Sequence, residues 1–263
     1  MTDTHTHIDG EEFNDDRHDT ILRAQAAGVS RLFLPAIDHA TCRAILDVCR
    51  QYPGVAYPML GLHPEEVRAD WQEQLRDIRT LLDASIQSDD PTQHPIAIGE
   101  VGLDYYWSRE FEGEQLAAFE EQVRWSIETR LPLMIHCRKA QNEMVRLLRR
   151  YERDLPGGVF HCFTGNEHEA EELLSFPRFV LGIGGVLTFK KSNLPQTLPA
   201  VVPLSRIVLE TDSPYMAPVP HRGERNESSF VPLICNRLAE AYGVSQEEVE
   251  RITNATVNRI FNI

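Results

Sequence analysis

The sequence has 263 residues, of which 42% are hydrophobic, and a formal net charge of −14 at neutral pH. This length suffices for a sizeable core and matches a single large α/β domain. The polar, acidic first residues and the lack of any apolar run of about 18 residues argue against a signal peptide and a membrane span.

Short apolar runs alternate along the chain with amphipathic stretches. The runs predict eight strands, at residues 4–8, 32–35, 55–60, 95–98, 133–135, 158–160, 179–183 and 207–209. Helical patterns separate them at 19–27, 40–51, 72–84, 114–129, 140–152 and 167–174, and two more close the chain at 230–241 and 246–261. Only the segment 193–202 is ambiguous, because two prolines interrupt it.

This alternation predicts an α/β fold with a parallel sheet and βαβ crossovers. Eight such units in about 250 residues predict a (β/α)8 TIM barrel, with an open doubly wound sheet as the alternative. No shift in composition marks a boundary, so we expect a single domain over residues 1–263. The five cysteines form no CxxC pair, which predicts free thiols, a reducing compartment and a cytoplasmic location.

Residues of metal-ligand type occur at the ends of the predicted strands. His5 and His7 lie two apart on the first strand, so their side chains can point to the same face. Four further residues of this kind end or directly follow later apolar runs: Glu100, His136, His161 and Asp212. The carboxyl ends of the strands meet at one face of such a barrel, so these residues predict a metal site there.

The donor set indicates the metal class only broadly. Four imidazoles and two carboxylates suit zinc, and also manganese, iron or cobalt, whereas sites for magnesium or calcium alone prefer oxygen donors. Six donors are more than one tetrahedral ion can use if one of its positions is to stay open for water. Two divalent ions about 3.5–4 Å apart fit the number better, and Glu100 is the expected bridge.

Other side chains near the predicted strand ends suggest a phosphate-bearing substrate. Cationic residues gather in the loops that follow the fourth, fifth, seventh and eighth strands, while most acidic residues lie on the helices. We expect Arg138 and Arg222 to bind phosphate oxygens. His63 could orient the substrate or bond to the backbone. Tyr105 and Tyr106 could lean over the site or pack within their loop, and we expect Trp107 to be a packing residue.

Six motifs, in the order DTHTHID, GLHP, AIGEVGLDYY, LMIHCRKA, GGVFHCFTG and VLETDSPYMAPVPHRGERN, together resemble the TatD family of metal-dependent deoxyribonucleases, within the amidohydrolase-like barrels. The resemblance extends from Thr2 to Asn226, and VERITNATVNRIF resembles the family's terminal helix. One position departs from it, since Ser228 stands where the family usually has proline. This departure bears on the shape of the loop and leaves the ligands intact.

The resemblance implies two ions, one held by His5, His7 and Glu100 with Asp212 close by, the other by Glu100, His136 and His161. It also implies a 3'–5' exonuclease acting on DNA, and in some members on RNA. We therefore expect phosphodiester hydrolysis by a water that two metals (zinc, manganese or magnesium) activate, with Asp212 and Glu100 as catalytic residues. The alternatives are hydrolysis of another ester or amide, such as a D-aminoacyl-tRNA, and a non-catalytic binding barrel.

Overall fold

The computed structural model describes every residue from Met1 to Ile263. The strands are β1 (Thr2–Asp3), β2 (Arg31–Pro35), β3 (Ala56–Leu60), β4 (Ala97–Asp104), β5 (Leu133–Arg138), β6 (Gly158–Phe160), β7 (Phe179–Ile183) and β8 (Ile207–Leu209). The helices are α1 (Arg17–Ala26), α2 (His39–Gln51), α3 (Trp71–Ile86), α4 (Glu112–Thr129), α5 (Gln141–Tyr151), α6 (Glu167–Leu174), α7 (Leu194–Val201), α8 (Val231–Tyr242) and α9 (Gln246–Phe261).

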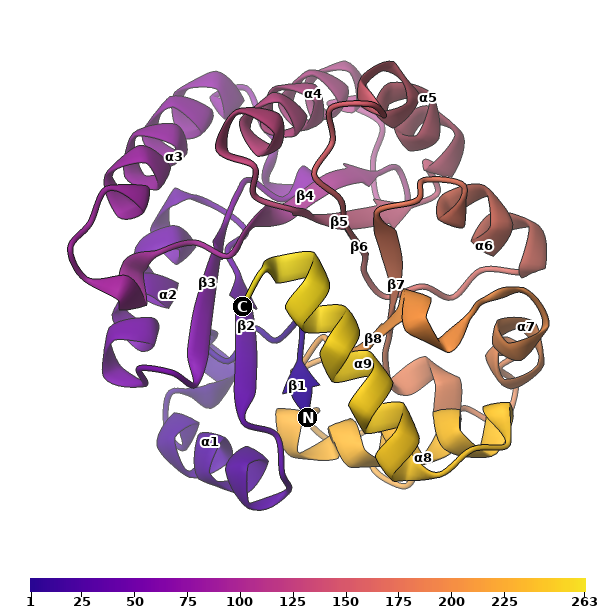
Figure 1. The fold of residues 1–263 in the computed structure, drawn as a ribbon. Coiled ribbons are helices and arrows are strands. Elements are labelled where there is room, and N and C mark those ends of the chain that lie inside the picture. The colour runs from indigo at the N-terminus through magenta and orange to yellow at the C-terminus, as the bar shows by residue number, and fades with distance from the viewer. The chain divides into compact units, whose positions relative to one another are not determined.

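The strands follow one another in the sheet in the order β1 to β8. A helix follows each strand from β2 to β8, and α1 follows β1 (Figure 1). A doubly wound sheet would reverse its strand order at a switch point, and no reversal occurs here. The predicted (β/α)8 fold class is therefore confirmed. None of the helices is both long and apolar enough to cross a membrane.

The chain divides into two compact units, which we call unit 1 and unit 2. Unit 1 comprises Met1–Leu34 and His161–Ile263, and unit 2 comprises Pro35–Phe160. The expectation of a single domain over residues 1–263 stays a prediction.

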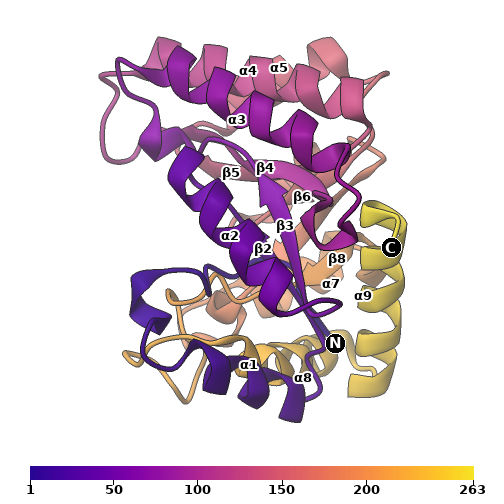
Figure 2. The same ribbon diagram turned by 90° about the vertical axis from the view of Figure 1, so that its left-hand side faces the viewer.

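Unit 2 carries strands β3 to β6 with helices α2 to α5 outside them (Figure 1). The strands pair in parallel, and all eight residues of β4 are buried, as expected for a strand covered on both faces. Asp38 caps the start of helix α2, and its side chain accepts a hydrogen bond from the backbone N–H of Thr41 in a capping box. Its buried face packs against β3, and it also contacts α3 (Figure 2).

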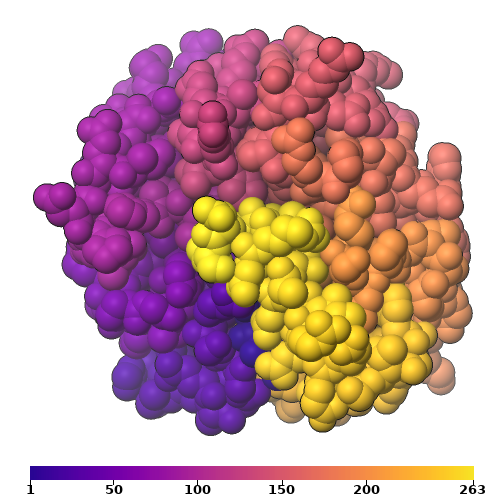
Figure 3. Space-filling model, in the orientation of Figure 1, coloured from indigo at the N-terminus to yellow at the C-terminus, as the bar shows by residue number.

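Unit 1 joins the two ends of the chain. Strand β1 pairs in parallel with the start of β2, and the backbone N–H of Thr4 donates to the carbonyl of Leu209 at the end of β8. Helix α9 lies against the start of β1, where Glu250 pairs with the amino terminus at 3.0 Å. Helices α8 and α9, coloured yellow, form an exposed surface of this unit (Figure 3). These contacts fix the position of β1, which carries His5 and His7 just beyond its end.

Four predicted elements differ clearly from the observed ones, and one of them is β5, which continues to Arg138 and not only to residue 135. The first strand is Thr2–Asp3, not 4–8, because the residues after Asp3 pair irregularly, with only an isolated bridge between Thr6 and Ser213. Strand β4 continues to Asp104, so Glu100 lies inside the strand and not past its end. The ambiguous segment forms helix α7, because its first proline lies in the first turn, where no backbone N–H is needed.

Candidate functional site

Unit 1 brings together four of the predicted ligands. The Nε2 atoms of His5 and His7 lie 3.3 Å apart, and the Oδ1 atom of Asp212 lies 3.6 Å and 3.7 Å from them. The ring of His161 stacks on that of His5, with 4.1 Å between centroids. The donor atoms of His5, His161 and Asp212 all lie within 4.8 Å of one another. This spacing suits donors that share one cation.

The backbone around β1 and the loop after β8 determines this geometry. The N–H of Asp212 donates to the carbonyl of His5 at 2.9 Å, and the N–H of His7 donates to Ser213 at 2.9 Å. Asp212 has a φ of 56°, in the left-handed region that aspartate tolerates better than most residues. The carboxylate of the fully buried Asp3 accepts from the N–H of Thr211 at 2.9 Å. These bonds hold Asp212 beside the histidine pair.

Glu210 is a buried carboxyl group that the sequence reasoning missed. It is 0% exposed, its Oε1 lies 3.8 Å from the Nδ1 of His161, and it accepts the backbone N–H of Cys162. Burial raises its pKa to about 8. A carboxyl group behind a candidate ligand histidine can orient the ring, as outer carboxylates do in metal sites. The available signal was the carboxylate two residues before Asp212 in the ETD motif.

Unit 2 brings together the other two predicted ligands and His63. The Nδ1 of His136 lies 2.9 Å from the Oε1 of Glu100, and the Nε2 of His63 lies 3.2 Å from the same oxygen. The Nδ1 of His63 accepts the backbone N–H of Glu65 at 3.1 Å. His63 therefore bonds to the backbone, as one alternative predicted, and it also faces a candidate ligand. Its role in orienting the substrate stays a prediction.

A break in the register of β4 against β5 helps to place Glu100. The pairing shifts between Ile98 and Val101, which indicates a bulge at Glu100. Gly102 then pairs with His136 at a φ of 142°, a conformation that other residues rarely adopt. A Cβ atom at this glycine would lie 1.9 Å from the carbonyl oxygen of His136. The close approach of β4 and β5 at the site therefore requires glycine.

Asp104 is the second functional candidate that the sequence reasoning missed. Its Oδ2 lies 2.9 Å from the Nε2 of His136, so this imidazole is held between two carboxylates. Burial opposes protonation of His136, but the hydrogen bonds with Asp104 and Glu100 outweigh it and raise its pKa to about 10. Only its place in the GLD motif, at the end of an apolar run, pointed to Asp104.

The donor chemistry of both groups fits a bound divalent cation. With its raised pKa, His136 is protonated on both ring nitrogens when no metal is bound, and one N–H faces Glu100 while the other faces Asp104. A divalent cation could replace the proton on the nitrogen that faces Glu100. The other nitrogen would still donate to Asp104, which is the usual outer partner of a ligand histidine. In unit 1, three imidazoles and one carboxylate converge in the same manner.

The predicted cationic residues fall into two classes. Some are engaged in ion pairs: Arg225 pairs with Asp16 at 2.6 Å, and Arg109 pairs with Glu112 at 3.3 Å. The two predicted phosphate ligands lie over aromatic rings instead. The guanidinium of Arg138 lies 3.6 Å from the ring centroid of Tyr106, and that of Arg222 lies 3.7 Å from that of Phe189. Stacked guanidinium groups keep their N–H donors available for a ligand.

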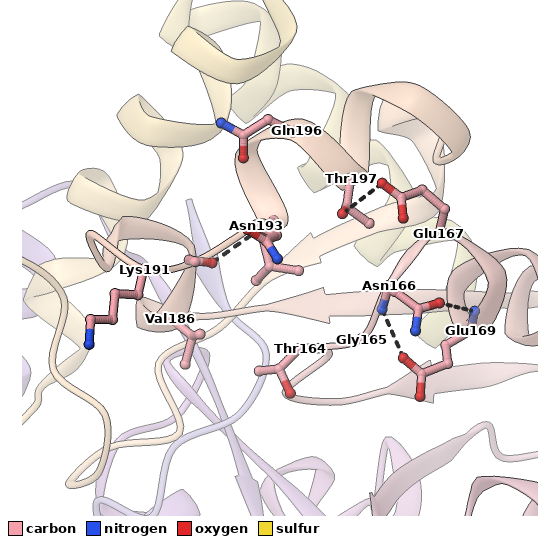
Figure 4. Close-up of a pocket in the computed structure, with 12 residues that line it drawn as sticks. Thr164, Gly165, Asn166, Glu167, Glu169, Val186, Lys191, Asn193, Gln196 and Thr197 are labelled. Carbon is pink, nitrogen blue, oxygen red and sulfur yellow. Dashed lines mark hydrogen bonds between the residues drawn. The ribbon is translucent and has the colours of Figure 1, made fainter.

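Unit 1 also contains a cavity of about 600 Å³ between the loops that follow β6 and β7 (Figure 4). One of its lining residues, Thr164, lies three residues after His161 in the chain. Its wall includes a capping box in which Asn166 and Glu169 bond to each other's backbone N–H, and a bond of 3.1 Å from Thr197 to Glu167. Its wall carries amides, hydroxyls, two carboxylates and the cation Lys191, so the cavity suits a polar ligand.

Comparisons with known proteins show which family this chain resembles over its length. The family model described as TatD related DNase matches residues 2–262. The metal-dependent hydrolase YabD of Bacillus subtilis, uncharacterized by its name, is 33% identical over 100% of this chain and 99% of its own length. The 3'-5' ssDNA/RNA exonuclease TatD of Cronobacter sakazakii is 33% identical over 99% of this chain and 97% of its own.

A solved structure agrees as well. The TatD homolog YJJV from Escherichia coli K12 superimposes with a TM-score of 0.89 at 26% identity, covering 100% of this chain and 98% of that one. The family match covers nearly the whole chain, and the motifs that carry the candidate ligands lie within it. This protein belongs to the TatD-related DNase family.

Proposed function

We propose that this protein is a metal-dependent nuclease that removes nucleotides from the 3' end of single-stranded DNA. The observation that carries the proposal is the pair of histidine–carboxylate groups, one in each unit, in a chain that matches the DNase family over residues 2–262. The name of the Cronobacter relative supports the polarity and the single-stranded substrate.

We propose that six residues would hold the divalent metal: His5, His7, Glu100, His136, His161 and Asp212. The number of ligands and the family support this assignment. The histidines favour zinc or manganese, whereas magnesium would be bound mainly through the carboxylate oxygens. When bound, such ions act as Lewis acids and lower the pKa of water toward about 7.

The protein's own residues orient the reacting groups. Asp212 lies within 3.7 Å of both histidines of the first pair, and we assign it the role of aligning the attacking water and accepting its proton. Arg138 and Arg222 bind phosphate oxygens and offset the charge that develops on them. His63, which faces Glu100, positions the substrate beside that carboxylate.

The role of Asp212 can be tested by replacing it with asparagine. Asp212→Asn retains the shape and removes the base, so turnover of single-stranded DNA should fall about 100-fold or more. Exposed Asp19 on α1 provides a matched control, and Asp19→Asn should leave turnover unchanged. Near-normal turnover by Asp212→Asn, with the metal content of the wild type, would contradict the assignment.

A second candidate function uses the same residues on another electrophile. Relatives such as YabD are named only as metal-dependent hydrolases, which leaves room for an aminoacyl ester or an amide. Parallel assays with single-stranded DNA and a D-aminoacyl-tRNA distinguish the two functions, and we expect hydrolysis of the DNA. We also propose a reducing, cytoplasmic environment, supported by the five free cysteines.

A further inference from the structure

Two large aromatic side chains project from the loop that follows β4 in unit 2. Tyr106 is 49% exposed and Trp107 is 68% exposed. Their rings contact each other edge to face, with 4.8 Å between centroids. Tyr105, by contrast, is buried. Trp107 was expected to pack within the protein, and its exposure contradicts that expectation. Exposed aromatic rings on a loop beside a candidate site indicate a binding surface.

A cation completes this surface. The guanidinium of Arg138 lies 3.6 Å from the ring centroid of Tyr106 and 5.3 Å from that of Trp107. Its positive charge also favours the ionised forms of Glu65 and Asp104 nearby, and so acts to lower the pKa of each. Arg109, by contrast, is paired directly with Glu112 at 3.3 Å. We call the three side chains Tyr106, Trp107 and Arg138 the aromatic platform.

Hydrogen bonds connect the platform to the candidate metal ligand His136. The backbone N–H of Tyr106 donates to Asp104 at 2.8 Å, and the other oxygen of Asp104 lies 2.9 Å from His136. The N–H of Tyr105 donates to the carbonyl of Arg138 at 2.9 Å. Asp104 thus positions both the ligand histidine and the start of the platform, so the platform has a fixed place beside that histidine.

We propose that the aromatic platform stacks against an unpaired base of the substrate strand, while Arg138 binds the adjacent phosphate. Bases stack on aromatic side chains without sequence preference, because every base has a π-face. A base inside a duplex offers no free face, so the platform selects single strands. This inference rests on the proposed function, since it concerns the substrate at the same site.

The pairing of aromatic rings with one local cation favours a nucleic-acid strand as the occupant. The protein carries a net charge of −14, so long-range electrostatics repels a polyanion. Stacking supplies attraction that does not depend on net charge, and Arg138 supplies one local positive charge at the same place. An apolar protein partner would gain nothing from this cation. The combination of two rings and one guanidinium therefore fits a base with its phosphate.

The test compares the binding of two oligonucleotides of equal charge to full-length protein in the presence of metal. One is a labelled oligo-dT, and the other is the same strand with abasic residues at its 3' end. Phosphorothioate linkages in both slow cleavage, so that fluorescence anisotropy reports binding whether or not the protein is a nuclease. The variants are Trp107→Leu and Tyr106→Leu, with Trp107→Phe and Tyr106→Phe to retain a ring. Ile86→Ala is the control, because Ile86 is an exposed apolar residue at the end of α3.

We expect each leucine variant to bind oligo-dT about tenfold more weakly than the wild type. The phenylalanine variants and Ile86→Ala should stay within about twofold of the wild type, and all proteins should bind the abasic strand equally weakly. Leucine variants that bind oligo-dT as the wild type does, or that lose equal affinity for both strands, would overturn the proposal. So would equal affinity of the wild type for duplex and single strand.

Cleavage of an unmodified oligo-dT separates this proposal from the proposed function. If the wild type binds through the platform and degrades no nucleic acid, the nuclease assignment fails and the platform stands. If the leucine variants degrade oligo-dT with the KM of the wild type, the platform fails and the nuclease assignment stands. The proposal predicts a raised KM with little change in kcat.

Discussion

Two of the candidate ligand histidines have a carboxyl group behind them. His136 lies 2.9 Å from Asp104, and His161 lies 3.8 Å from the fully buried Glu210. The hydrogen bond with Asp104 fixes the orientation of the His136 ring and raises the basicity of the nitrogen that would face a metal. Glu210 lies beyond hydrogen-bond distance of His161 in the structure. Neither carboxyl group is among the proposed ligands, yet each lies close enough to a proposed ligand histidine to influence the orientation of its ring.

The substitution Asp104→Asn tests this positioning role. Asparagine keeps an oxygen for the N–H of Tyr106 but removes the charge that faces His136. We expect metal affinity to fall about 10- to 100-fold while the fold is retained. Metal titration followed by calorimetry measures the change, and Asp77→Asn on the exposed side of α3 serves as the control. Unchanged affinity in Asp104→Asn would show that Asp104 does not support the ligand.

Gly102 offers a test of the close approach between β4 and β5. Alanine at this position would place its Cβ 1.9 Å from a backbone oxygen, and its φ of 142° is strained for any side chain. We expect Gly102→Ala to lower the free energy of unfolding by about 3 kcal/mol or more, measured by urea denaturation.

Gly113 in the first turn of α4 is the matched control for Gly102, because a Cβ there meets nothing within 4 Å. Gly113→Ala should be neutral or stabilise the fold by up to about 1 kcal/mol. Equal stability of the two alanine variants would contradict the steric account of the site.

For single residues, the sequence predicts which side chains can bind a metal better than it predicts which side chains surround them. His5, His7, His136 and His161 could be identified from their places at the ends of apolar runs. Asp104 and Glu210 could not, because a carboxylate acquires its role from burial and from the atom it faces, and both depend on the packing of distant segments. The same reason explains why Trp107 was taken for a packing residue although it is 68% exposed.

Helix α1 is tied to the segment before α8 by a group of four charged residues. Arg23 donates to Glu227 at 2.6 Å and to Asp16 at 3.1 Å, and Arg225 pairs with Asp16 at 2.6 Å. The hydrogen bond with Arg225 lowers the pKa of Asp16 well below its usual range. Burial raises the pKa of Glu227, but the bond with Arg23 outweighs it and the net shift is downward.

These shifts predict how stability depends on pH. A carboxyl group with a lowered pKa contributes stability above its unfolded pKa of about 4, and that contribution is lost as pH falls through the folded pKa. Arg23→Met should lower the free energy of unfolding by about 1 kcal/mol at pH 7, a modest value because water screens these partly exposed groups. The difference from the wild type should shrink between about pH 4 and pH 2. Urea titrations in EDTA measure it, and a difference that grows in acid would refute the account.

The bounds of the strands were predicted less well than their existence. The predicted fourth strand ended at residue 98, whereas β4 continues to Asp104 through a bulge. Two glycines in IGEVGLD suggest a loop by composition, and pairing with β5, and with β3 at Ile98, keeps this segment extended. The first strand is shorter than predicted because neighbouring strands determine where regular pairing ends.

The net charge of the whole molecule determines how strongly it should bind DNA and how that binding should depend on salt. The charge of −14 and the few cationic residues that lack ion pairs predict weak binding of DNA with a shallow dependence on salt. If Arg138 and Arg222 each neutralise one phosphate, the slope of log K against log salt should be about −1.4 for a single strand. Anisotropy titrations over a range of salt concentrations measure it. A slope several times steeper would require phosphate contacts that this account lacks.

The fold class was predictable because it follows from periodicity along the whole chain. Eight apolar runs separated by amphipathic segments admit few arrangements, and the observed strand order from β1 to β8 matches the predicted one. What the pattern could not provide is the division into two compact units, which depends on contacts between residues 1–34 and the last hundred or so residues of the chain.

Metal ions held by these histidines and carboxylates should make the protein a 3'-end nuclease. The most direct test incubates metal-stripped protein with a 5'-labelled single-stranded oligonucleotide, adding back zinc, manganese or magnesium one at a time. We predict no cleavage in EDTA, and restored cleavage with at least one metal that yields a ladder shortened from the 3' end. Cleavage that persists after metal removal, or no cleavage with any metal, would contradict it.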